Sequence, residues 1–494
     1  MAQNLTPSPK VSLRPRGRLM AFSLVLWGCG GAQDTAQPTG LVDTEDTANP
    51  TEDVGFDVRG SEKNPLARYV DVTLTKPGKA RVEFWGEDTI RLETPPTAMG
   101  TIHSIPLIGL RANAVTNAVV HVEWEDETQS TSEPQEISTA ALEFQAPVFD
   151  FPVPMENDGV ITVFGLAQDL GASIQAEFVG ITREGEVVWV GRSGETTAGA
   201  SFFEQTDEGL LLNYYPSSSQ GSGRTYDLLS PTSDTVSQIK SPFSMHHDGA
   251  VLPGGNLASM HRVRRVVEVP GHGEVPLTGD AIAEVSPSGE VLWEWNSFDH
   301  LDTNRFPVGV SQINSGDWTH GNTLDYLPET DELLAGFRNQ NQVMTISRST
   351  QEITRTFGAD GDYTLLSGAW FRGQHQASIH SDNLLTVFDN HYPKTPAMKT
   401  RIVEYRFDDD QKTAEQVWSY DLGYFYRSGG EATVLENGHL RVSAGGANRD
   451  DDAPIQVIEF DEKRNIIWHV EVPTDAIPMV FRSSQITAGT PIQP

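Results

Sequence analysis

From residue 66 to residue 153, apolar and polar side chains alternate over short stretches. Two clear stretches are 69–74 and 80–85, and Lys-Pro-Gly and Pro-Pro turns separate such stretches. Because successive side chains of a strand point to opposite faces, this period of two predicts strands with one buried face. We therefore expect a small antiparallel β-sandwich over residues 66–153.

Beyond residue 153 the chain repeats a strand-rich unit, and this repeat predicts the architecture. Five units close on a similar apolar strand, at 185–189, 289–293, 351–357, 414–418 and 464–468. Four units open on a second shared pattern, at 247–257, 320–328, 375–385 and 431–440. The spacing of these openings leaves room for four-stranded blades joined by loops.

A weaker copy of the opening pattern begins at Phe203, and one further blade is expected ahead of it. No convincing amphipathic helix interrupts these units. We therefore predict an all-β protein in which a six-bladed β-propeller, residues 154–494, follows the sandwich. In such a ring the innermost strands surround one central channel.

The segment 1–28 has the pattern of an export signal. Four basic and no acidic side chains precede an apolar run, residues 19–27, that is too short to span a bilayer. The sole cysteine, Cys29, follows this run, and the segment around it resembles the lipobox of bacterial lipoproteins. We expect cleavage before Cys29 and lipidation of its thiol, with a plain cleaved signal peptide as the alternative.

Residues 29–65 are rich in threonine, proline, glycine and acidic side chains, which predicts an acidic tether without a packed core. The whole chain carries 35 basic and 68 acidic side chains, a formal net charge of −33. Such a surface repels phosphate backbones, so nucleic acid is not an expected partner. No apolar run after residue 28 is long enough for a transmembrane helix. We expect an exported protein, in the periplasm or at the outer membrane or cell surface, attached only through the lipid on Cys29.

Three histidines occupy the same position of successive opening patterns: His247, His320 and His375. Arg338 follows His320 on the next expected strand of that blade. Because equivalent positions of a propeller meet at one mouth of the channel, we expect these four side chains around one anion-sized space. Three imidazoles also suit zinc, but a guanidinium among them opposes a divalent cation. We therefore predict no metal and no cofactor, with metal-dependent hydrolysis as a minor alternative.

The motifs around these residues resemble those of the bacterial arylsulfotransferases. Thr319-His320-Gly321-Asn322 resembles the H-x-N motif of that family, and Arg338 ends a segment similar to its S-x-R motif. Gln374-His375, followed by Phe388-Asp389-Asn390, resembles the Q-H and F-D-N motifs. The order and spacing of the motifs together make the resemblance specific.

This resemblance implies an aryl sulfate:phenol sulfotransferase. His375 would take the sulfuryl group from a phenolic sulfate ester, hold it as a sulfohistidine and pass it to a phenol in a ping-pong sequence. The side chains of His247, His320 and Arg338 would bind the sulfuryl oxygens, and the histidines would also exchange protons with the phenols. Asn322 would add an uncharged donor. No nucleotide sulfate donor is expected, because the chain has no glycine-rich phosphate loop followed by Lys and Ser or Thr.

The resemblance covers roughly residues 66–490 and includes the tail 481–483, which is similar to the Y-R-A ending of the family. Within the sandwich, residues 103–110 resemble a segment of fibronectin type III-like modules. An immunoglobulin or fibronectin type III-like fold is therefore expected there. The expected partners are the phenolic sulfate donor and the phenol acceptor, and a homo-oligomer stays open.

Other interpretations stay open beside these. A propeller can serve as a non-catalytic surface protein that binds a ligand or another protein at its mouth. His246 and His247 point to opposite faces of one strand, and the register of the repeats favours His247 as the residue of the channel. The repeated tryptophans are expected to pack blade against blade. A structural role is expected for the remaining strand histidines, His246, His261, His380, His391 and His439.

Overall fold

The computed structural model describes residues 54–492, apart from 88, 143, 145, 166–177, 192–196, 207–208, 217–222, 307–315, 381–382, 393–397, 447–448, 473–479 and 481. The export signal, Cys29 and most of the tether therefore lie outside the described residues. Strands form nearly all of the regular structure, and the α-helix α1 spans only Ser297–His300, so the all-β prediction is confirmed. No helix in the described part is long and apolar enough to cross a membrane.

An eight-stranded antiparallel sheet precedes the propeller. Its centre is the long strand β2 (Arg68–Gly86), on which Val70, Val72 and Leu74 are buried and the residues between them are not. This pattern confirms the predicted alternation. The other strands of the sheet are β1 (Phe56–Gly60), β3 (Leu92–Glu93), β4 (Gly100–Leu107), β5 (Val115–Trp124), β6 (Gln129–Thr131), β7 (Gln135–Ser138) and the C-terminal β33 (Thr490–Pro491).

Two strands pair outside the segments to which the sequence assigned them. Strand β1 falls within the segment predicted as tether, but it pairs with β2 along its whole length and buries Phe56. Strand β8 (Asp150–Val153) falls within the predicted sandwich, but it pairs with a strand of the propeller. The immunoglobulin or fibronectin type III-like identity of the N-terminal sheet stays a prediction.

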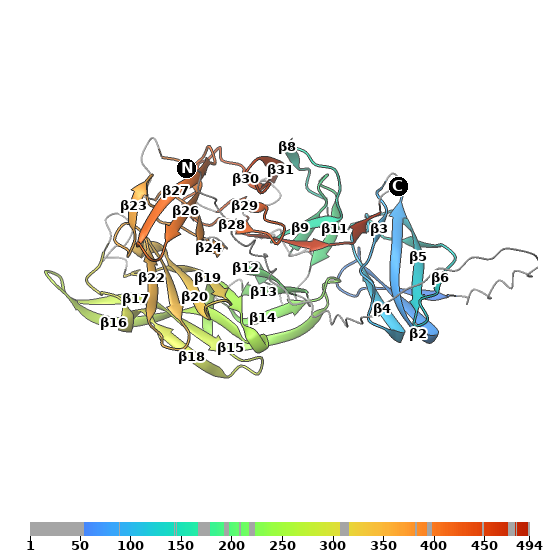
Figure 1. Ribbon diagram of the computed structural model, residues 1–494, viewed down its shortest axis with the longest axis horizontal. Helices are drawn as coiled ribbons and strands as arrows, with labels where there is room; N and C mark the ends of the chain where they lie inside the picture. The colour runs from blue at the N-terminus through green and yellow to red at the C-terminus, as the bar shows by residue number, and fades with distance from the viewer. Residues whose placement is uncertain are drawn as a thin grey trace, which may run out of the picture.

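The strands of the propeller form five sheets around the ring, as Figure 1 shows. Each sheet runs antiparallel from strand to strand, except for one parallel pair, β23 (Thr364–Ser367) with β27 (Thr413–Asp421). The first sheet holds β9 (Val160–Gly165), β10 (Phe178–Ile181), β11 (Val187–Gly191) and β32 (Ser483–Thr487). The second has seven strands: β12 (Thr197–Thr206), β13 (Gly209–Pro216), β14 (Gly223–Leu229), β15 (Thr235–Val251), β16 (Leu257–Val269), β17 (Gly273–Val285) and β18 (Val291–Asn296).

The remaining three sheets follow the repeat pattern closely. The third holds β19 (Gly321–Leu327), β20 (Glu332–Phe337), β21 (Gln342–Ser347) and β22 (Ile353–Phe357). The fourth holds β23 (Thr364–Ser367), β24 (Ala377–His380), β25 (Leu384–Asp389), β26 (Arg401–Asp408) and β27 (Thr413–Asp421). The fifth holds β28 (Glu431–Val434), β29 (Leu440–Ala444), β30 (Ile455–Phe460), β31 (Ile466–Val472) and β8.

The prediction of six blades was wrong in number, because two repeat units share one sheet. Strand β15 is 17 residues long. Its first half pairs with β14, and its second half, from Met245 to Val251, pairs with β16. The hydrogen-bond ladder therefore continues between the unit that begins near Phe203 and the unit that begins at His247. Five sheets result, and one of them has seven strands where the others have four or five.

Strands from both ends of the propeller segment of the chain close the ring. From the C-terminal side, β32 pairs with β9 of the first sheet, and from the N-terminal side, β8 pairs with β31 of the last. Next to β32, the guanidinium of Arg482 donates to Oδ1 of Asp248 at 2.8 Å, and both side chains are buried. Burial raises the pKa of Asp248 to about 6, although the charge of Arg482 opposes this shift.

The Arg482→Gln variant is expected to lose about 3 kcal/mol of unfolding free energy at pH 7.5, because Asp248 then stays buried without its cation. The loss should be smaller at pH 5.5, below the pKa of Asp248, because the carboxyl is then largely protonated with or without Arg482. Urea unfolding at the two pH values measures the difference. Arg482→Lys, which keeps the charge, is the control, and an equal loss at both pH values would contradict this account.

Neighbouring sheets pack through the tryptophans of the repeat. The indole of Trp189 donates to the carbonyl of Pro231, and the indole of Trp468 donates to the carbonyl of Arg183 on the first sheet. Both indoles are buried. In the unit that closes at 289–293, the buried tryptophan that reaches the next sheet is Trp295. The predicted packing role of the repeated tryptophans is thus confirmed for Trp189 and Trp468.

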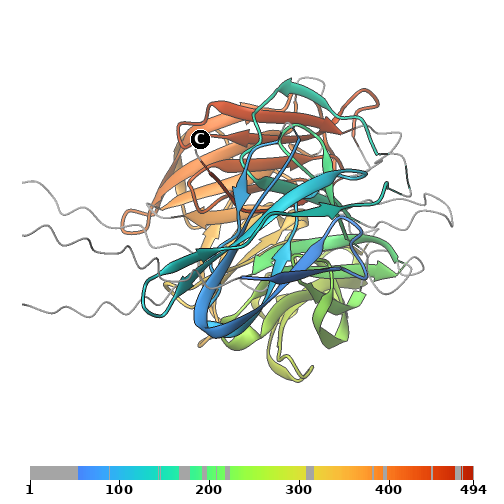
Figure 2. The same ribbon diagram turned by 90° about the vertical axis from the view of Figure 1, so that its right-hand side faces the viewer.

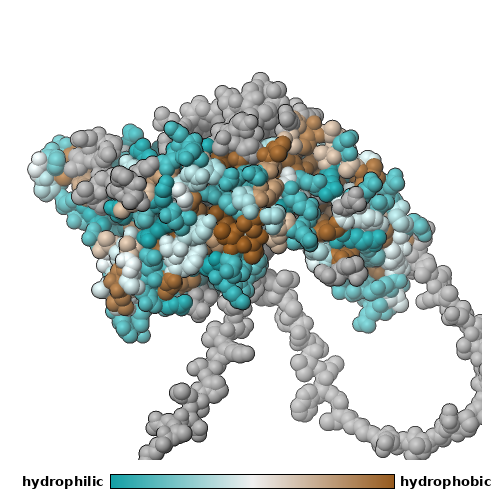
Figure 3. All heavy atoms as spheres, turned by 90° about the horizontal axis from the view of Figure 1, so that it is seen from above, coloured by the Kyte–Doolittle hydropathy of each residue, from teal (hydrophilic) through white to brown (hydrophobic). Residues whose placement is uncertain are grey.

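The N-terminal sheet lies beside the propeller, in front of it in the view of Figure 2. One continuous apolar core joins the two, since Val82 and Leu107 of the N-terminal sheet share a cluster with Ile161 and Trp189 of the propeller. Strand β33 also pairs with β3. The surface seen in Figure 3 is mostly hydrophilic, with hydrophobic residues in small separate areas.

Candidate active site

Two of the three aligned histidines adopt an unusual backbone conformation. His247 has φ of 59° and His320 has φ of 51°, in the left-handed region that L-residues rarely occupy. Such strain is often found at functional positions. The two imidazole rings meet edge to face with their centroids 5.1 Å apart, although the residues belong to different units of the repeat. The repeat register therefore predicted their proximity correctly.

His320 is held by an acid that sequence reasoning had not selected. Its Nδ1 lies 2.7 Å from Oδ2 of Asp317, and both side chains are partly exposed. Burial opposes ionisation of Asp317, but the hydrogen bond and charge of His320 outweigh it and lower the pKa of the carboxyl. With Nδ1 turned to the carboxylate, Nε2 of His320 is the nitrogen left for substrate. The signal in the sequence was an aspartate shortly ahead of the motif histidine.

Arg338 begins the short 3-10 turn Arg338–Gln340 at the end of β20. Its backbone N–H donates to the carbonyl of His320 at 3.1 Å, so the two residues are neighbours. The side chain is 8% exposed, and Nη1 donates to Oδ1 of Asn339. Among the described residues its Nε has no hydrogen-bond partner, and no carboxylate pairs with the guanidinium. The ring of Tyr392 lies 4.8 Å from the guanidinium carbon. A buried cation with free donor capacity is suited to bind an anion.

His375 is buried and held through both ring nitrogens. Nδ1 lies 2.7 Å from Oδ1 of Asn390, and Nε2 accepts the backbone N–H of Gly429 at 2.9 Å. The amide nitrogen of Asn390 donates to the carbonyls of Tyr426 and Gly429, which leaves its oxygen as the group that faces His375. An amide oxygen only accepts, so Nδ1 carries the proton and Nε2 carries the lone pair. This tautomer makes Nε2 the nucleophilic atom.

The backbone around His375 is fixed by strand β19 of the preceding sheet. Asn322 donates from its amide nitrogen to the carbonyl of Gln374, and the hydroxyl of Thr323 donates to the carbonyl of His375, both at 2.9 Å. Asn322 is 1% exposed. These contacts let Asn322 position the backbone next to His375, and its predicted role as a substrate donor stays a prediction.

The charges of the cluster act on one another. The pKa of His375 lies well below its usual value, first because of burial and then because of the charge of Arg338. The pKa of His247 is also well below its usual value, because of burial and the charges of His246, His320 and His375. Both imidazoles are therefore neutral at neutral pH, and a neutral imidazole has a lone pair that can attack an electrophile or accept a proton.

The two adjacent histidines, His246 and His247, have different partners. His247 meets His320, whereas His246 is 1% exposed and has Nε2 3.0 Å from Oδ1 of the buried Asp280. The Nδ1 atoms of the two histidines lie 2.8 Å apart. The same Asp280 accepts hydrogen bonds from the hydroxyl of Thr319 and the N–H of Gly321, on either side of His320. His246 thus contacts His247, and Asp280 holds the residues on either side of His320.

The other histidines expected to be structural have partners elsewhere in the fold. His261 stacks on Phe243, and the others bond to neighbouring polar groups: His380 to Ser378, His391 to the carbonyl of Lys399, and His439 to Glu459. Within the described residues, no three or more His, Cys, Asp or Glu side chains are grouped so as to hold a metal ion.

Comparisons with known proteins bear on the family of the chain. The family model described as arylsulfotransferase (ASST) matches residues 155–481. A curated relative, the arylsulfate sulfotransferase AssT of Escherichia coli O6:H1, is 29% identical over 216 residues, which cover 30% of this chain and 36% of the relative. The aligned region thus spans about a third of the length of that relative.

Solved structures give only distant likenesses. A protein of unknown function from Bacteroides caccae has a TM-score of 0.41 at 13% identity, over 66% of this chain and 98% of that one. The Cps50 (Swd1) β-propeller domain of Myceliophteria thermophila has a TM-score of 0.36 at 11% identity, over 68% and 89%. The assignment therefore depends on the family match, which covers most of the chain and contains all four residues of the His/Arg cluster. The chain belongs to the arylsulfotransferase family.

Proposed function

We propose that this protein transfers a sulfuryl group from a phenolic sulfate ester to a phenol in two steps, through a sulfohistidine at His375. The observation that carries the proposal is the hydrogen bonding and charge environment of His375. Asn390 holds its Nδ1 proton, its Nε2 lone pair accepts the N–H of Gly429, a contact that the substrate must displace, and burial and the cation of Arg338 lower its pKa. A neutral nucleophile beside a fixed cation is what attack on an anionic ester requires.

In the first step, Nε2 of His375 attacks the sulfur of the aryl sulfate. The N–S bond forms as the bond between sulfur and the phenolic oxygen breaks, and the phenolate leaves with the bonding electron pair. Arg338 binds the sulfuryl oxygens, where negative charge is concentrated throughout the transfer. The N–H of Gly429, which lies 2.9 Å from Nε2 in the free protein, is close enough to donate to one of these oxygens.

In the second step, a phenol replaces the first product and its oxygen attacks the same sulfur. The N–S bond breaks, and the electron pair returns to Nε2 of His375. The proton of the acceptor hydroxyl passes to an imidazole, for which the His320 and Asp317 pair is the favoured group. Asp317 stabilises the imidazolium that forms. The same pair protonates the departing phenolate in the first step, so the proton balance closes over one cycle.

The same proposal includes where the protein lies in the cell and what its N-terminal segments do. An export signal over residues 1–28 would bring the protein out of the cytoplasm, and a lipid on Cys29 would hold it at a membrane. The N-terminal sheet would then serve as a spacer. These elements supply no group to the reaction.

The proposal is tested by incubating the protein with 4-nitrophenyl sulfate, with and without a second phenol. Release of nitrophenol should accelerate when the second phenol is added, and initial rates at several acceptor concentrations should give the parallel double-reciprocal lines of a ping-pong mechanism. Without acceptor, the peptide that contains His375 should carry one sulfuryl group by mass spectrometry. Intersecting lines and an unmodified peptide would contradict the proposal.

Asn390→Ala is expected to lower kcat by about 10²-fold while KM for the donor changes little. The loss follows because the Nδ1 proton is no longer held and the attacking nitrogen is misplaced. The measurement is steady-state transfer from 4-nitrophenyl sulfate. Asn465→Ala, at the tip of an exposed loop, is the matched control. A kcat equal to that of the control would remove Asn390 from the mechanism.

A further inference from the structure

A second binding site lies outside the His/Arg cluster, in a pocket between the third and fourth sheets. Its volume is about 380 Å³, and none of His247, His320, Arg338 or His375 lines it. Pockets that bind small molecules have volumes of about 300–1,000 Å³. We call it the lateral pocket, and its walls include Trp370, Phe371, Met398, Arg305, Arg372 and Asp360.

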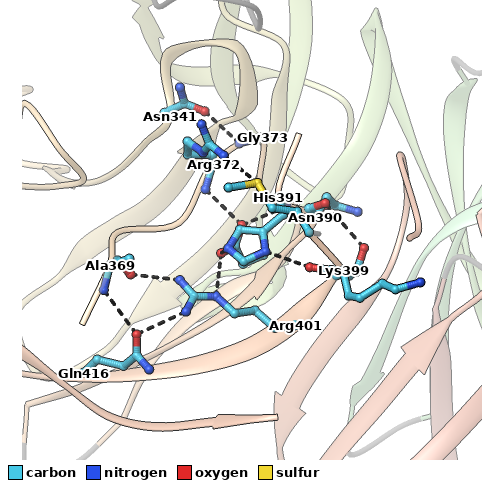
Figure 4. A network of polar contacts seen from close by, with 12 residues as sticks. Asn341, Ala369, Arg372, Gly373, Asn390, His391, Lys399, Arg401 and Gln416 are labelled. Carbon is cyan, nitrogen blue, oxygen red and sulfur yellow. Dashed lines mark hydrogen bonds and ion pairs between the residues drawn. The ribbon is translucent and has the colours of Figure 1, made fainter. Parts of the chain in front are cut away.

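The apolar part of the lateral pocket is aromatic. Trp370 packs against Tyr405 with the ring centroids 4.9 Å apart, and Phe371 is fully buried beside it. The backbone of this wall is fixed, because the carbonyl of Ala369 accepts hydrogen bonds from the side chains of Arg401 and Tyr405. Figure 4 shows Ala369 and Arg401 in this contact. A flat aromatic ring suits such a preformed wall.

The polar part of the lateral pocket is positively charged. Arg305 donates to Asp360, whose side chain is 73% exposed, and also to the oxygens of Gln340. The guanidinium of Arg372 contacts Sδ of Met398 at 2.9 Å, and no carboxylate among the described residues pairs with it. The lining of the pocket therefore holds two guanidinium groups and one carboxylate, in a chain whose net charge is −33. Such a local excess of positive charge favours an anion.

The backbone of Arg372 is fixed independently of its side chain. Its N–H donates to Oδ1 of the buried Asp389, which also accepts from the N–H of His391, while Oδ2 accepts from Nε of Arg401. The next residue, Gly373, donates its N–H to Asn341 at 2.7 Å, as Figure 4 shows. The guanidinium is thus presented from a rigid loop, and a change of its side chain leaves these backbone contacts intact.

We infer that the lateral pocket binds an aromatic anion, a planar ring that carries one sulfate, sulfonate or carboxylate group. The ring lies against Trp370, and the acidic group pairs with Arg372. A sulfate ester could fill this site and the His/Arg cluster at the same time, because the two sites share no lining residue. Binding in the lateral pocket requires no transfer reaction, so it extends beyond the proposed function.

Isothermal titration calorimetry with 1-naphthalenesulfonate tests the inference, because a sulfonate has no ester bond to transfer. The wild-type chain should bind two molecules. Arg372→Gln should weaken one of the two sites at least tenfold, since a charged hydrogen bond is worth about 1.5–3 kcal/mol. Trp370→Leu should weaken the same site, and Arg372→Lys should retain most of its affinity. Arg406→Gln, an exposed arginine of β26 in the same sheet, is the matched control and should bind two molecules.

Arg338→Gln distinguishes the two sites, because it should weaken only the site at the His/Arg cluster. In a different outcome, the wild-type chain binds one molecule only, with binding lost in Arg338→Gln and kept in Arg372→Gln. This result would overturn the inference about the lateral pocket and leave the proposed function intact. A single molecule lost in Arg372→Gln and kept in Arg338→Gln would support the pocket and argue against the cluster. Two sites that persist in both Arg372→Gln and Trp370→Leu would overturn the inference, as would no binding at all.

Discussion

His375→Asn is expected to abolish transfer from 4-nitrophenyl sulfate, with kcat lowered by roughly 10⁴- to 10⁶-fold, the range found when a nucleophile is removed from an enzyme. Asparagine matches part of the imidazole in size and polarity, so the loss reflects chemistry more than packing. Without Nε2 no covalent intermediate forms, and the sulfuryl mass on the peptide that contains position 375 should also disappear. Initial rates and intact mass together measure both effects.

A control for His375→Asn comes from a histidine that also bonds to a buried side chain but has no place in the cluster. His439 bonds to the buried Glu459 on the fifth sheet, and His439→Asn should transfer at the wild-type rate. If His375→Asn kept more than a hundredth of the wild-type rate, the nucleophile would have to be another group. Thermal unfolding of both variants would show that each is folded.

The proximity of equivalent histidines was predictable from the sequence. A propeller places equivalent positions of its repeats at one mouth of the channel, whatever their separation along the chain. His247 and His320 show this, since their rings meet although they open different units of the repeat. The alternation of β2 was predictable for a similar reason, because the period of two is a local property of a strand.

The number of blades was not predictable in the same way. Whether β15 bends into two strands or continues as one depends on its pairing with β14 and β16, which the repeat pattern does not encode. The roles of Asp317 and Asn390 were also missed. Each acts by holding one ring nitrogen of a histidine, and that depends on loop geometry and on the tautomer it selects.

The positive φ of His247 and His320 connects the fold to the site. A left-handed backbone at a non-glycine residue costs of order 1–3 kcal/mol, and it persists only where surrounding contacts hold it. For His320 those contacts are Asp317, Asp280 through Thr319 and Gly321, and the backbone of Arg338. In this conformation the ring of His320 meets that of His247.

Arg338→Gln is expected to lower kcat for transfer by about 10²- to 10³-fold, the usual effect of removing one fixed donor from a charged transition state. It should also change the pH dependence. In the wild type, burial and the charge of Arg338 hold the pKa of His375 well below its ordinary 6.5, so activity should persist below pH 6.5 and fall only when Nε2 is protonated. Removing the cation raises this pKa, so the acid limb of kcat/KM should move to higher pH.

Arg338→Lys separates charge from geometry in this prediction. Lysine keeps the positive charge near His375, so the acid limb should stay close to the wild-type position, while kcat falls because the planar fork of donors is lost. Full pH profiles of the three proteins give the measurement. An acid limb that is the same in Arg338→Gln and in the wild type would mean that the guanidinium does not act on His375, and the electrostatic basis of the proposed nucleophile would then fail.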